Sequence, residues 1–231
     1  MIVYNDKAAL RKAFKAAGSN LAAFFVEPIQ GDAGVIVADE DYLQEARALC
    51  DEHNVLLVCD EVQTGIARTG KLLGHYWSGI RPDMVLLGKA TTGGMYPVSY
   101  VLADDEVMLA VEPGTHGSTY GGNPLGAAVA MRALQVVEED GLVERAERLG
   151  NVLRDGLRDI QARNPVIQTV RGRGLLIGVV IDQSKTNGHG GADLCELMAR
   201  KGLLVSSAAP LRLTRWVDAH VLISNSCIAQ V

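Results

Sequence analysis

The sequence predicts an α/β fold in which a mostly parallel sheet is flanked by helices. Two short apolar runs, residues 55–59 and 84–87, have the uninterrupted pattern of buried parallel strands. A helical pattern at residues 42–53 separates a third apolar run, residues 22–26, from the run at 55–59. A strand, a helix and a strand in this order form a unit whose two strands are parallel, and this unit decides the fold class.

The composition is that of a globular protein and excludes several classes of function. The chain has 231 residues, 48% of them apolar, and a net charge of −5 with no basic run, so we expect no nucleic-acid partner. No apolar run reaches membrane-spanning length and no signal-peptide pattern opens the chain, so we expect a cytoplasmic protein. The cysteines show no metal-ligand spacing, and we expect free thiols and no metal at Cys50, Cys59, Cys195 and Cys227.

The first elements of the chain alternate between helix and strand. An amphipathic pattern covers residues 8–17, and the strand at 22–26 then leads into a polar loop punctuated by glycine. Asp39 or Asp41 is suited to cap the helix at 42–53, because a short side-chain oxygen accepts from the free amides of a first turn.

Beyond the strand at 84–87 the pattern continues with a strand at 98–102 and a loop at 112–123 that is too small and polar to be core. Pro124 opens an alanine-rich helix, because a first helical turn tolerates proline. A second long helix is expected over residues 142–163, where apolar positions recur at helical spacing.

After residue 163 the pattern changes to short strands. We expect strands at 166–170, 175–181 and 203–205 and a helix at 192–200. The Arg-Gly-Arg-Gly run at 171–174 is interpreted as a turn, with phosphate binding as the less favoured alternative.

Each of the two central strands is followed by a charged side chain. Asp60 comes directly after the run at 55–59, and Lys89 follows the run at 84–87 and one glycine. In an open parallel sheet the carboxyl ends of the strands meet at the edge where ligands bind. We therefore expect a carboxylate and a primary amine at the same edge of the sheet.

This pair of groups suits pyridoxal phosphate (PLP). A lysine forms the internal Schiff base with the PLP aldehyde, and a carboxylate beside the pyridine nitrogen keeps that nitrogen protonated. Gln63 follows Asp60 by three residues and is suited to bind the ring oxygen, and a polar loop with Ser118 and Thr119 completes the set. After substrate displaces Lys89 from the Schiff base, the freed lysine amine can transfer a proton, provided that the pKa of that amine is depressed.

Asp60 and Glu61 after an apolar strand also resemble the magnesium-binding strand of a P-loop ATPase. That class requires the pattern G-x-x-x-x-G-K-[ST]. Lys89 follows a glycine but is followed by Ala90, and no such pattern surrounds it. We therefore favour the PLP site.

Four ordered motifs extend this interpretation to a family. They are VEPIQG at residues 26–31, DEVQTG at 60–65 followed by ARTG at 67–70, LGKA at 87–90, and HGSTYGGNPLG at 116–126. In order and spacing they resemble the class III aminotransferases, and among these most closely the ornithine aminotransferases. The resemblance runs from about residue 20 to about residue 204, and it implies the large-domain portion of the fold type I PLP-dependent transferases.

The resemblance implies a role for each motif residue. Lys89 is implied to be the Schiff-base lysine, Asp60 the partner of the ring nitrogen, and Gln63 the contact of the ring oxygen. Thr119, with Ser118 beside it, is implied to reach the cofactor phosphate of a neighbouring subunit, so we expect a homodimer with shared sites.

The implied reaction transfers the δ-amino group of ornithine to a 2-oxo acid such as 2-oxoglutarate, giving glutamate 5-semialdehyde and glutamate. Glu27 corresponds to a family position behind the ring. Asp32 stands where ornithine aminotransferases usually carry glutamate, the acid thought to pair with a C-terminal arginine and to select between the two substrates. Acetylornithine and 4-aminobutyrate aminotransferases remain alternatives, as does a non-catalytic homologue.

The family resemblance also suggests how the chain is divided. We expect residues 1–140 to be part of the large PLP-binding domain, residues 141–205 part of a small C-terminal domain, and residues 206–231 a divergent tail. The glycine-rich phosphate turn, the stacking aromatic ring and a substrate-binding arginine of the family have no counterpart among these residues. Arg212 and Arg215 are a weak candidate for replacing the family's C-terminal arginine.

Overall fold

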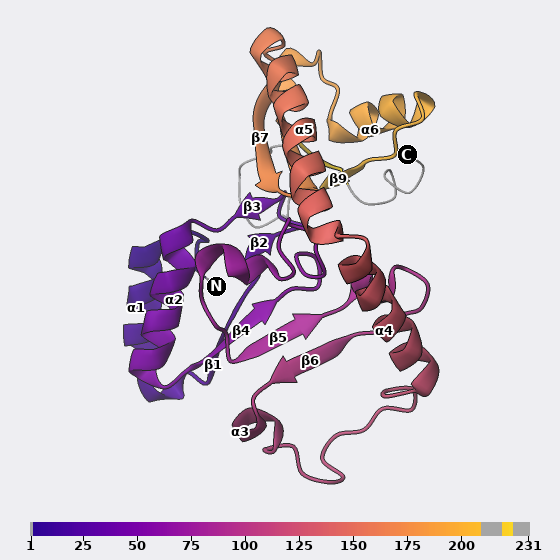
Figure 1. Cartoon of the computed structure of the whole chain (residues 1–231). Helices are drawn as coiled ribbons and strands as arrows, with labels where there is room; N and C mark the ends of the chain where they lie inside the picture. The colour runs from indigo at the N-terminus through magenta and orange to yellow at the C-terminus, as the bar shows by residue number, and fades with distance from the viewer. Residues whose placement is uncertain (1, 209–218, 224–231) are drawn as a thin grey trace. The chain divides into compact units, whose positions relative to one another are not determined.

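The computed structural model of the chain describes residues 2–208 and 219–223 (Figure 1). These residues form two compact units. The first comprises residues 2–28, 38–67 and 72–142, and the second comprises residues 29–37, 68–71, 143–208 and 219–223. The sequence-based domain ranges, with a boundary near residue 140, stay a prediction. Arg212 and Arg215 lie outside the described residues.

A four-stranded sheet forms the centre of the first unit, in the order β1-β4-β5-β6. The strands are β1 (Ala23–Val26), β4 (Leu56–Asp60), β5 (Met84–Leu87) and β6 (Tyr100–Ala103). β1, β4 and β5 run parallel, whereas β6 is antiparallel to β5. The expectation of a mostly parallel sheet in an α/β fold is therefore confirmed.

Two long helices pack beside β1 and β4 in this unit, α1 (Lys7–Ala17) and α2 (Glu40–His53) (Figure 1). The side chain of Asp6 caps α1 by accepting the N–H of Ala9 at 2.8 Å. Asp39 occupies the N-cap position of α2, but its side chain accepts no hydrogen bond from the first turn, so the expected side-chain cap does not form there. The apolar side of each helix contributes to one core cluster with the strands, in which Phe14 of α1 contacts Phe24 of β1 edge to face.

Shorter elements connect the sheet to a further helix in the same unit. They are η1 (Gly18–Asn20), η2 (Gly74–Ser78), η3 (Lys89–Thr92), α3 (Asp105–Met108) and α4 (Pro124–Glu139). Asn123 caps α4 by accepting the N–H of Gly126 at 2.7 Å, and Pro124 occupies the first turn as expected. Because α4 packs against η3, the segment that begins with Lys89 has a helix behind it.

The second unit is built around an antiparallel sheet in the order β7-β8-β10-β9. Its elements are α5 (Leu142–Arg163), β7 (Ile167–Arg173), β8 (Leu176–Ile181), η4 (Gln183–Lys185), α6 (Gly191–Arg200), β9 (Ser206–Ala208), β10 (Ala219–Ile223) and the small pair β2 (Ile29–Gln30) and β3 (Ile36–Val37). Within the described residues, no helix has the length and apolar character needed to cross a membrane.

Two local expectations for the second unit were wrong. Arg171 and Arg173 belong to β7 and pair with β8, so the turn is confined to Gly174 and Leu175. The short strand expected at 203–205 forms instead at Ser206–Ala208. In both cases pairing with a neighbouring strand decides where the strand begins and ends, and short apolar runs do not encode that choice.

Candidate functional site

Three charged residues stand at or just after the ends of the three parallel strands of the first unit. Val26 pairs with Cys59, so Glu27 and Asp60 come at equivalent positions at the ends of β1 and β4. Asp60 pairs in turn with Leu86, three residues before Lys89. The parallel register therefore places the ends of all three strands at one carboxyl edge, the edge where α/β sheets bind ligands.

The loop before Lys89 lies against the turn that follows Asp60. A Cβ added to Gly88 would lie 3.5 Å from Cγ1 of Val62 and 3.7 Å from Cβ of Ser99. The two charged strand ends are thus brought together by direct packing of their loops as well as by strand pairing.

Lys89 is exposed and adopts an unfavourable backbone conformation. Its φ is +45°, a left-handed value that side chains other than glycine and asparagine seldom adopt. Such strain persists only where the surrounding structure imposes it, and it gathers at functional sites. Here the strained residue is the lysine that sequence reasoning singled out for covalent chemistry.

Asp60 and Gln63 lie in one short turn, and both are partly buried. Oδ1 of Asp60 accepts the N–H of Val62 at 3.0 Å, which orients the carboxylate across its own turn. Gly65 closes the turn by donating its N–H to the carbonyl oxygen of Glu61 at 2.8 Å. The turn therefore presents a carboxylate and an amide from a fixed backbone.

The buried side chain of Glu61 is a feature of this turn that the sequence-based reasoning missed. Glu61 is 1% exposed, and its two carboxylate oxygens accept hydrogen bonds from Thr64, Gly74 and His75. A threonine three residues after an acid is a weak local signal of such a bond. No sequence signal links Glu61 to His75, which is 14 residues away.

The pKa of Glu61 is set by two opposed effects. Burial raises it, but the hydrogen bonds from the His75 ring, the Thr64 hydroxyl and the backbone amides lower it, and the pKa lies below its usual range. Glu61 is consequently a buried carboxylate that stays ionised at neutral pH. A buried charge is tolerated here because donors surround it.

The other predicted site residues lie in separate loops. Ser118 and Thr119 are exposed, in the loop before α4, and Oγ of Ser118 accepts the N–H of Gly121 at 2.9 Å. Asp32 is exposed in the loop between β2 and β3 of the second unit. The structure thus brings Glu27, Asp60, Gln63 and Lys89 to one edge, whereas the cofactor role of the other residues stays a prediction.

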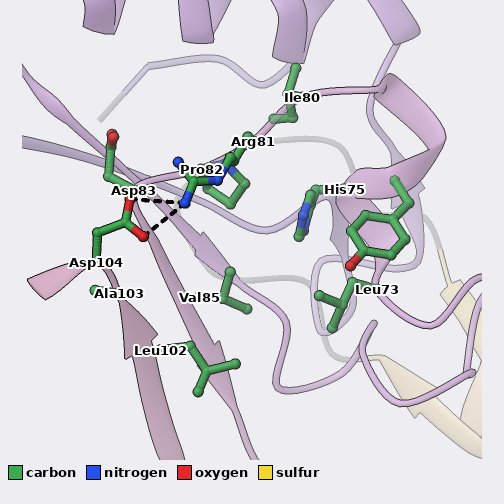
Figure 2. Close-up of a pocket in the computed structure, with 11 residues that line it drawn as sticks. Leu73, His75, Ile80, Arg81, Pro82, Asp83, Val85, Leu102, Ala103 and Asp104 are labelled. Atoms are coloured by element: carbon green, nitrogen blue, oxygen red, sulfur yellow. Dashed lines mark hydrogen bonds and ion pairs between the residues drawn. The ribbon is translucent and has the colours of Figure 1, made fainter.

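A cavity of about 450 Å³ lies at the opposite, amino edge of the sheet (Figure 2). Its wall includes the ring of His75 and the ion pair in which Nη2 of Arg81 lies 2.7 and 2.9 Å from the carboxylate oxygens of Asp104. Asp104 follows the last residue of β6, and Ala103 pairs with Met84, the first residue of β5. The strand residues of its wall therefore lie toward the amino end of β5, whereas His75, also in its wall, binds Glu61 next to Asp60.

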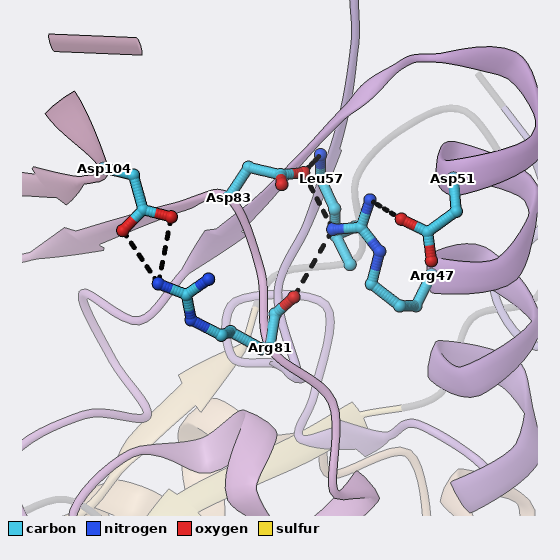
Figure 3. A network of polar contacts seen from close by, with 6 residues as sticks. All are labelled: Arg47, Asp51, Leu57, Arg81, Asp83 and Asp104. Carbon is cyan, nitrogen blue, oxygen red and sulfur yellow. Dashed lines mark hydrogen bonds and ion pairs between the residues drawn. The ribbon is translucent and has the colours of Figure 1, made fainter. Parts of the chain in front are cut away.

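Next to this cavity, a polar network fixes the start of two strands (Figure 3). Oδ2 of Asp83 accepts the N–H of Leu57 at 2.6 Å and lies 2.7 Å from Nη1 of Arg47. Arg47 also pairs with Asp51 at 2.7 Å. Because Asp83 precedes β5 and Leu57 lies in β4, this network holds the two strands in register at the edge opposite the candidate site.

Metal chemistry receives no support from the described part of the chain. There, no group of three or more His, Cys, Asp or Glu side chains gathers in a way that would hold a metal ion. The described cysteines, Cys50, Cys59 and Cys195, are free thiols, as expected.

The family model for Aminotransferase class-III matches residues 4–230. The chain belongs to the class III aminotransferases. The match is longer than the stretch from about 20 to 204 on which the motifs alone indicated the resemblance.

Relatives of this class III aminotransferase chain include enzymes named for ornithine. The ornithine aminotransferase of Emericella nidulans is 73% identical over 239 residues, a match that covers 100% of this chain and 52% of the relative. The ornithine aminotransferase car2 of Schizosaccharomyces pombe is 57% identical over 201 residues, covering 87% of this chain and 45% of the relative. The chain therefore spans about half the length of the curated relatives it matches.

Solved structures agree with the fold. Plasmodium falciparum ornithine δ-aminotransferase matches with a TM-score of 0.87 and 42% identity, covering 96% of this chain and 55% of that one. Acetylornithine aminotransferase from Elizabethkingia anophelis matches with the same TM-score of 0.87 and 45% identity, covering 96% of this chain and 56% of that one. The expected aminotransferase fold is confirmed, and the fold by itself does not separate these two activities.

Proposed function

We propose that this chain supplies the lysine and the aspartate of a PLP site in an aminotransferase that acts on ornithine. The observation that carries the proposal is the placement of Asp60 and Lys89 after adjacent parallel strands, at one sheet edge. In the proposed reaction, the δ-amino group of ornithine passes to a 2-oxo acid such as 2-oxoglutarate, giving glutamate 5-semialdehyde and glutamate.

The residues at this edge fit the cofactor, because an exposed primary amine and a partly buried carboxylate and amide come from the ends of adjacent parallel strands. Class III aminotransferases are PLP-dependent, and the ornithine aminotransferase of Toxoplasma gondii has been described with partial occupancy of PLP at the protein active site. Lys89 would bind the aldehyde, Asp60 the ring nitrogen and Gln63 the ring oxygen. When bound, PLP supplies a protonated ring that takes up electrons as a C–H bond of the substrate breaks.

The side chains at the edge have separate tasks in this proposal. The carboxylate of Asp60 would hold a proton on the ring nitrogen, and the amide of Gln63 would donate a hydrogen bond to the ring oxygen. Nζ of Lys89 would take the proton from the substrate carbon that bears the amino group. The left-handed backbone at Lys89 supports this task, because it fixes the direction in which a long, flexible side chain leaves the loop.

We propose further that the working enzyme is a homodimer in which Ser118 and Thr119 bind the phosphate of the neighbouring cofactor. The exposure of both residues supports this proposal, since they are accessible to a second chain. Exposed apolar side chains also occur in and near the same loop, including Leu109 and Tyr120.

Ornithine is favoured over acetylornithine by sequence identity. The two curated relatives described above, which are 73% and 57% identical to this chain, are both ornithine aminotransferases. Asp32, one methylene shorter than the usual glutamate, is proposed to weaken selection between the two substrates. We expect activity with ornithine to exceed activity with N-acetylornithine.

The proposal is tested by adding PLP to the purified chain and recording its absorption spectrum. A band from lysine-bound PLP is expected in the wild-type chain and should be absent in Lys89→Ala. The matched control is Lys12→Ala, at an exposed position of α1, which should keep the band. Reduction with borohydride followed by peptide mass spectrometry should locate the pyridoxyl group on Lys89.

The substrate is tested with the same protein. Ornithine and 2-oxoglutarate should yield glutamate 5-semialdehyde, and N-acetylornithine in place of ornithine should react more slowly. A spectrum that is the same in wild type and Lys89→Ala would instead favour a non-catalytic homologue.

A further inference from the structure

Glu61 is the residue that directly follows Asp60, and its side chain is not required by the proposed chemistry. Its buried carboxylate nevertheless accepts four hydrogen bonds. Oε1 accepts the N–H and the ring Nδ1 of His75, both at 2.8 Å, and Oε2 accepts the N–H of Gly74 at 2.8 Å and the hydroxyl of Thr64.

These four donors satisfy the hydrogen-bonding capacity of the Glu61 carboxylate, which can only accept. An ionised carboxylate donates nothing and accepts at both oxygens, so four donors match its capacity. The bond from Nδ1 of His75 requires the proton to be on that nitrogen. The side chains of Glu61, Thr64 and His75 are all buried, and in such surroundings each of these bonds is difficult to replace with water.

The same residue is tied to the strand that leads to Lys89. The N–H of Glu61 donates to the carbonyl oxygen of Leu86 in β5 at 2.9 Å, and its own carbonyl oxygen accepts from Gly65 at 2.8 Å. Glu61 therefore links four segments: β4, β5, the turn that carries Gln63, and the start of η2.

Backbone strain follows immediately after this turn. Ile66 and Ala67 have φ values of +54° and +69°, which are unfavourable for side chains with a Cβ and most of all for a β-branched residue. A strained pair of residues needs neighbours that impose its conformation. The Glu61 carboxylate accepts hydrogen bonds from Thr64, before this pair in the chain, and from Gly74, after it.

We propose that Glu61 is a positioning residue that orients Asp60 and Gln63 for PLP. This inference rests on the proposed function, because it assigns the two cofactor contacts to a turn whose shape the Glu61 carboxylate sets. Asp60 precedes the anchored residue, and Gln63 lies between Val62, which packs beside Gly88, and Thr64, which donates to Glu61. Neither contact residue can shift without disturbing an anchored neighbour.

The test compares variants of the turn with a control at the far edge of the same sheet. Glu61→Gln keeps the shape but removes the charge and one acceptor oxygen, and Thr64→Val removes one donor without changing size. Thr64→Ser keeps the hydroxyl and is the conservative rescue. Asp83→Asn is the structural control, because Asp83 also accepts a β4 amide and an arginine but lies away from the site.

Two measurements are made at a temperature where far-ultraviolet circular dichroism shows every variant to be folded. The dissociation constant of PLP should rise by about tenfold in Glu61→Gln, a typical effect of losing a group that orients a ligand-binding residue. It should rise less in Thr64→Val and remain at the wild-type value in Thr64→Ser and Asp83→Asn. Amide hydrogen exchange should quicken at residues 61–67 and 74–75 in Glu61→Gln without quickening in α1.

The outcomes distinguish failure of the positioning role of Glu61 from failure of the proposed function. If Glu61→Gln lowers the melting temperature as Asp83→Asn does but binds PLP as tightly as wild type, the carboxylate is merely structural and the positioning role is overturned. If the wild-type chain forms no Lys89-dependent band, the proposed function fails and the cofactor role of the turn fails with it. If Glu61→Gln does not fold, the pair Thr64→Val and Thr64→Ser decides, and equal PLP affinity in these two variants overturns the positioning role.

Discussion

Nδ1 of His75, in η2, lies 2.8 Å from Oε1 of Glu61, the residue after β4, and both side chains are buried. The pKa of Glu61 is lowered in the folded chain, since its hydrogen bonds outweigh the effect of burial. A lowered pKa means that this carboxylate stabilises the fold above its unfolded pKa, and the contribution is lost as the pH falls through the folded pKa.

We therefore expect acid sensitivity that depends on Glu61. The free energy of unfolding of the wild-type chain should decrease as the pH falls below about 4.3, the usual pKa of a glutamate. Glu61→Gln should be less stable by about 1–3 kcal/mol at neutral pH, because buried donors lose their acceptor, and should show a flatter dependence on acid pH. Urea unfolding between pH 3 and 7 measures both, and parallel pH profiles would refute this assignment.

Strain at Lys89 predicts an order of stability among its variants. A φ of +45° costs alanine more than glycine, because glycine has no Cβ to meet the backbone. Lys89→Gly should be more stable than Lys89→Ala by about 1 kcal/mol, and neither should bind PLP covalently. Denaturant unfolding of the two apoproteins makes the comparison, and equal midpoints would show that the loop relaxes when the lysine is removed.

The two glycines of the candidate site should respond differently to alanine. A Cβ on Gly65 would lie 2.7 Å from Cδ2 of Leu87 and 2.9 Å from the carbonyl oxygen of Glu61, closer than real contacts allow. Gly65→Ala should therefore cost about 1–3 kcal/mol. Gly88→Ala is the matched control, since its Cβ would meet Val62 at an ordinary 3.5 Å. Thermal unfolding distinguishes them, and similar losses in both variants would contradict the packing described for the turn.

Two glycines of helix α5 offer a second matched pair, in the other unit. A Cβ on Gly150 would lie 2.0 Å from the carbonyl oxygen of Gly174, whereas a Cβ on Gly156 would meet nothing within 4 Å. Gly156→Ala should stabilise the chain by about 0.5–1 kcal/mol through helix propensity. Gly150→Ala should destabilise it, because a backbone atom has to move. A Gly150→Ala variant as stable as wild type would show that α5 does not pack on this turn.

The free thiols should differ in reactivity. Cys50 and Cys59 are fully buried, and burial raises the pKa of Cys50 to about 11 and that of Cys59 further. Cys195 is only partly buried. In a Cys227→Ser background, a thiol reagent should modify Cys195 first and reach the other two only after unfolding. Mass spectrometry of the labelled peptides measures the order, and early labelling of Cys59 would contradict the packing of α2 on β4.

Several properties of this protein follow from the sequence alone. Apolar runs, helical periodicity and glycine-punctuated loops determine the α/β class, the helices and the parallel strands, because these patterns encode which faces are buried. Asp60 and Lys89 also stand out without a structure, since each follows a buried strand and their motifs lie in family order. Local chemistry and spacing suffice for these inferences.

Only the tertiary structure decides how the site is held together. The partnership of Glu61 with His75 spans 14 residues, the contact of Gly88 with Val62 joins two loops, and β7 extends through Arg173 because it pairs with β8. The left-handed backbone at Lys89 likewise depends on neighbours rather than on its own side chain. The sequence by itself determines which groups are available at the sheet edge, whereas long-range hydrogen bonding and packing decide their conformation, because those contacts join residues that share no local pattern.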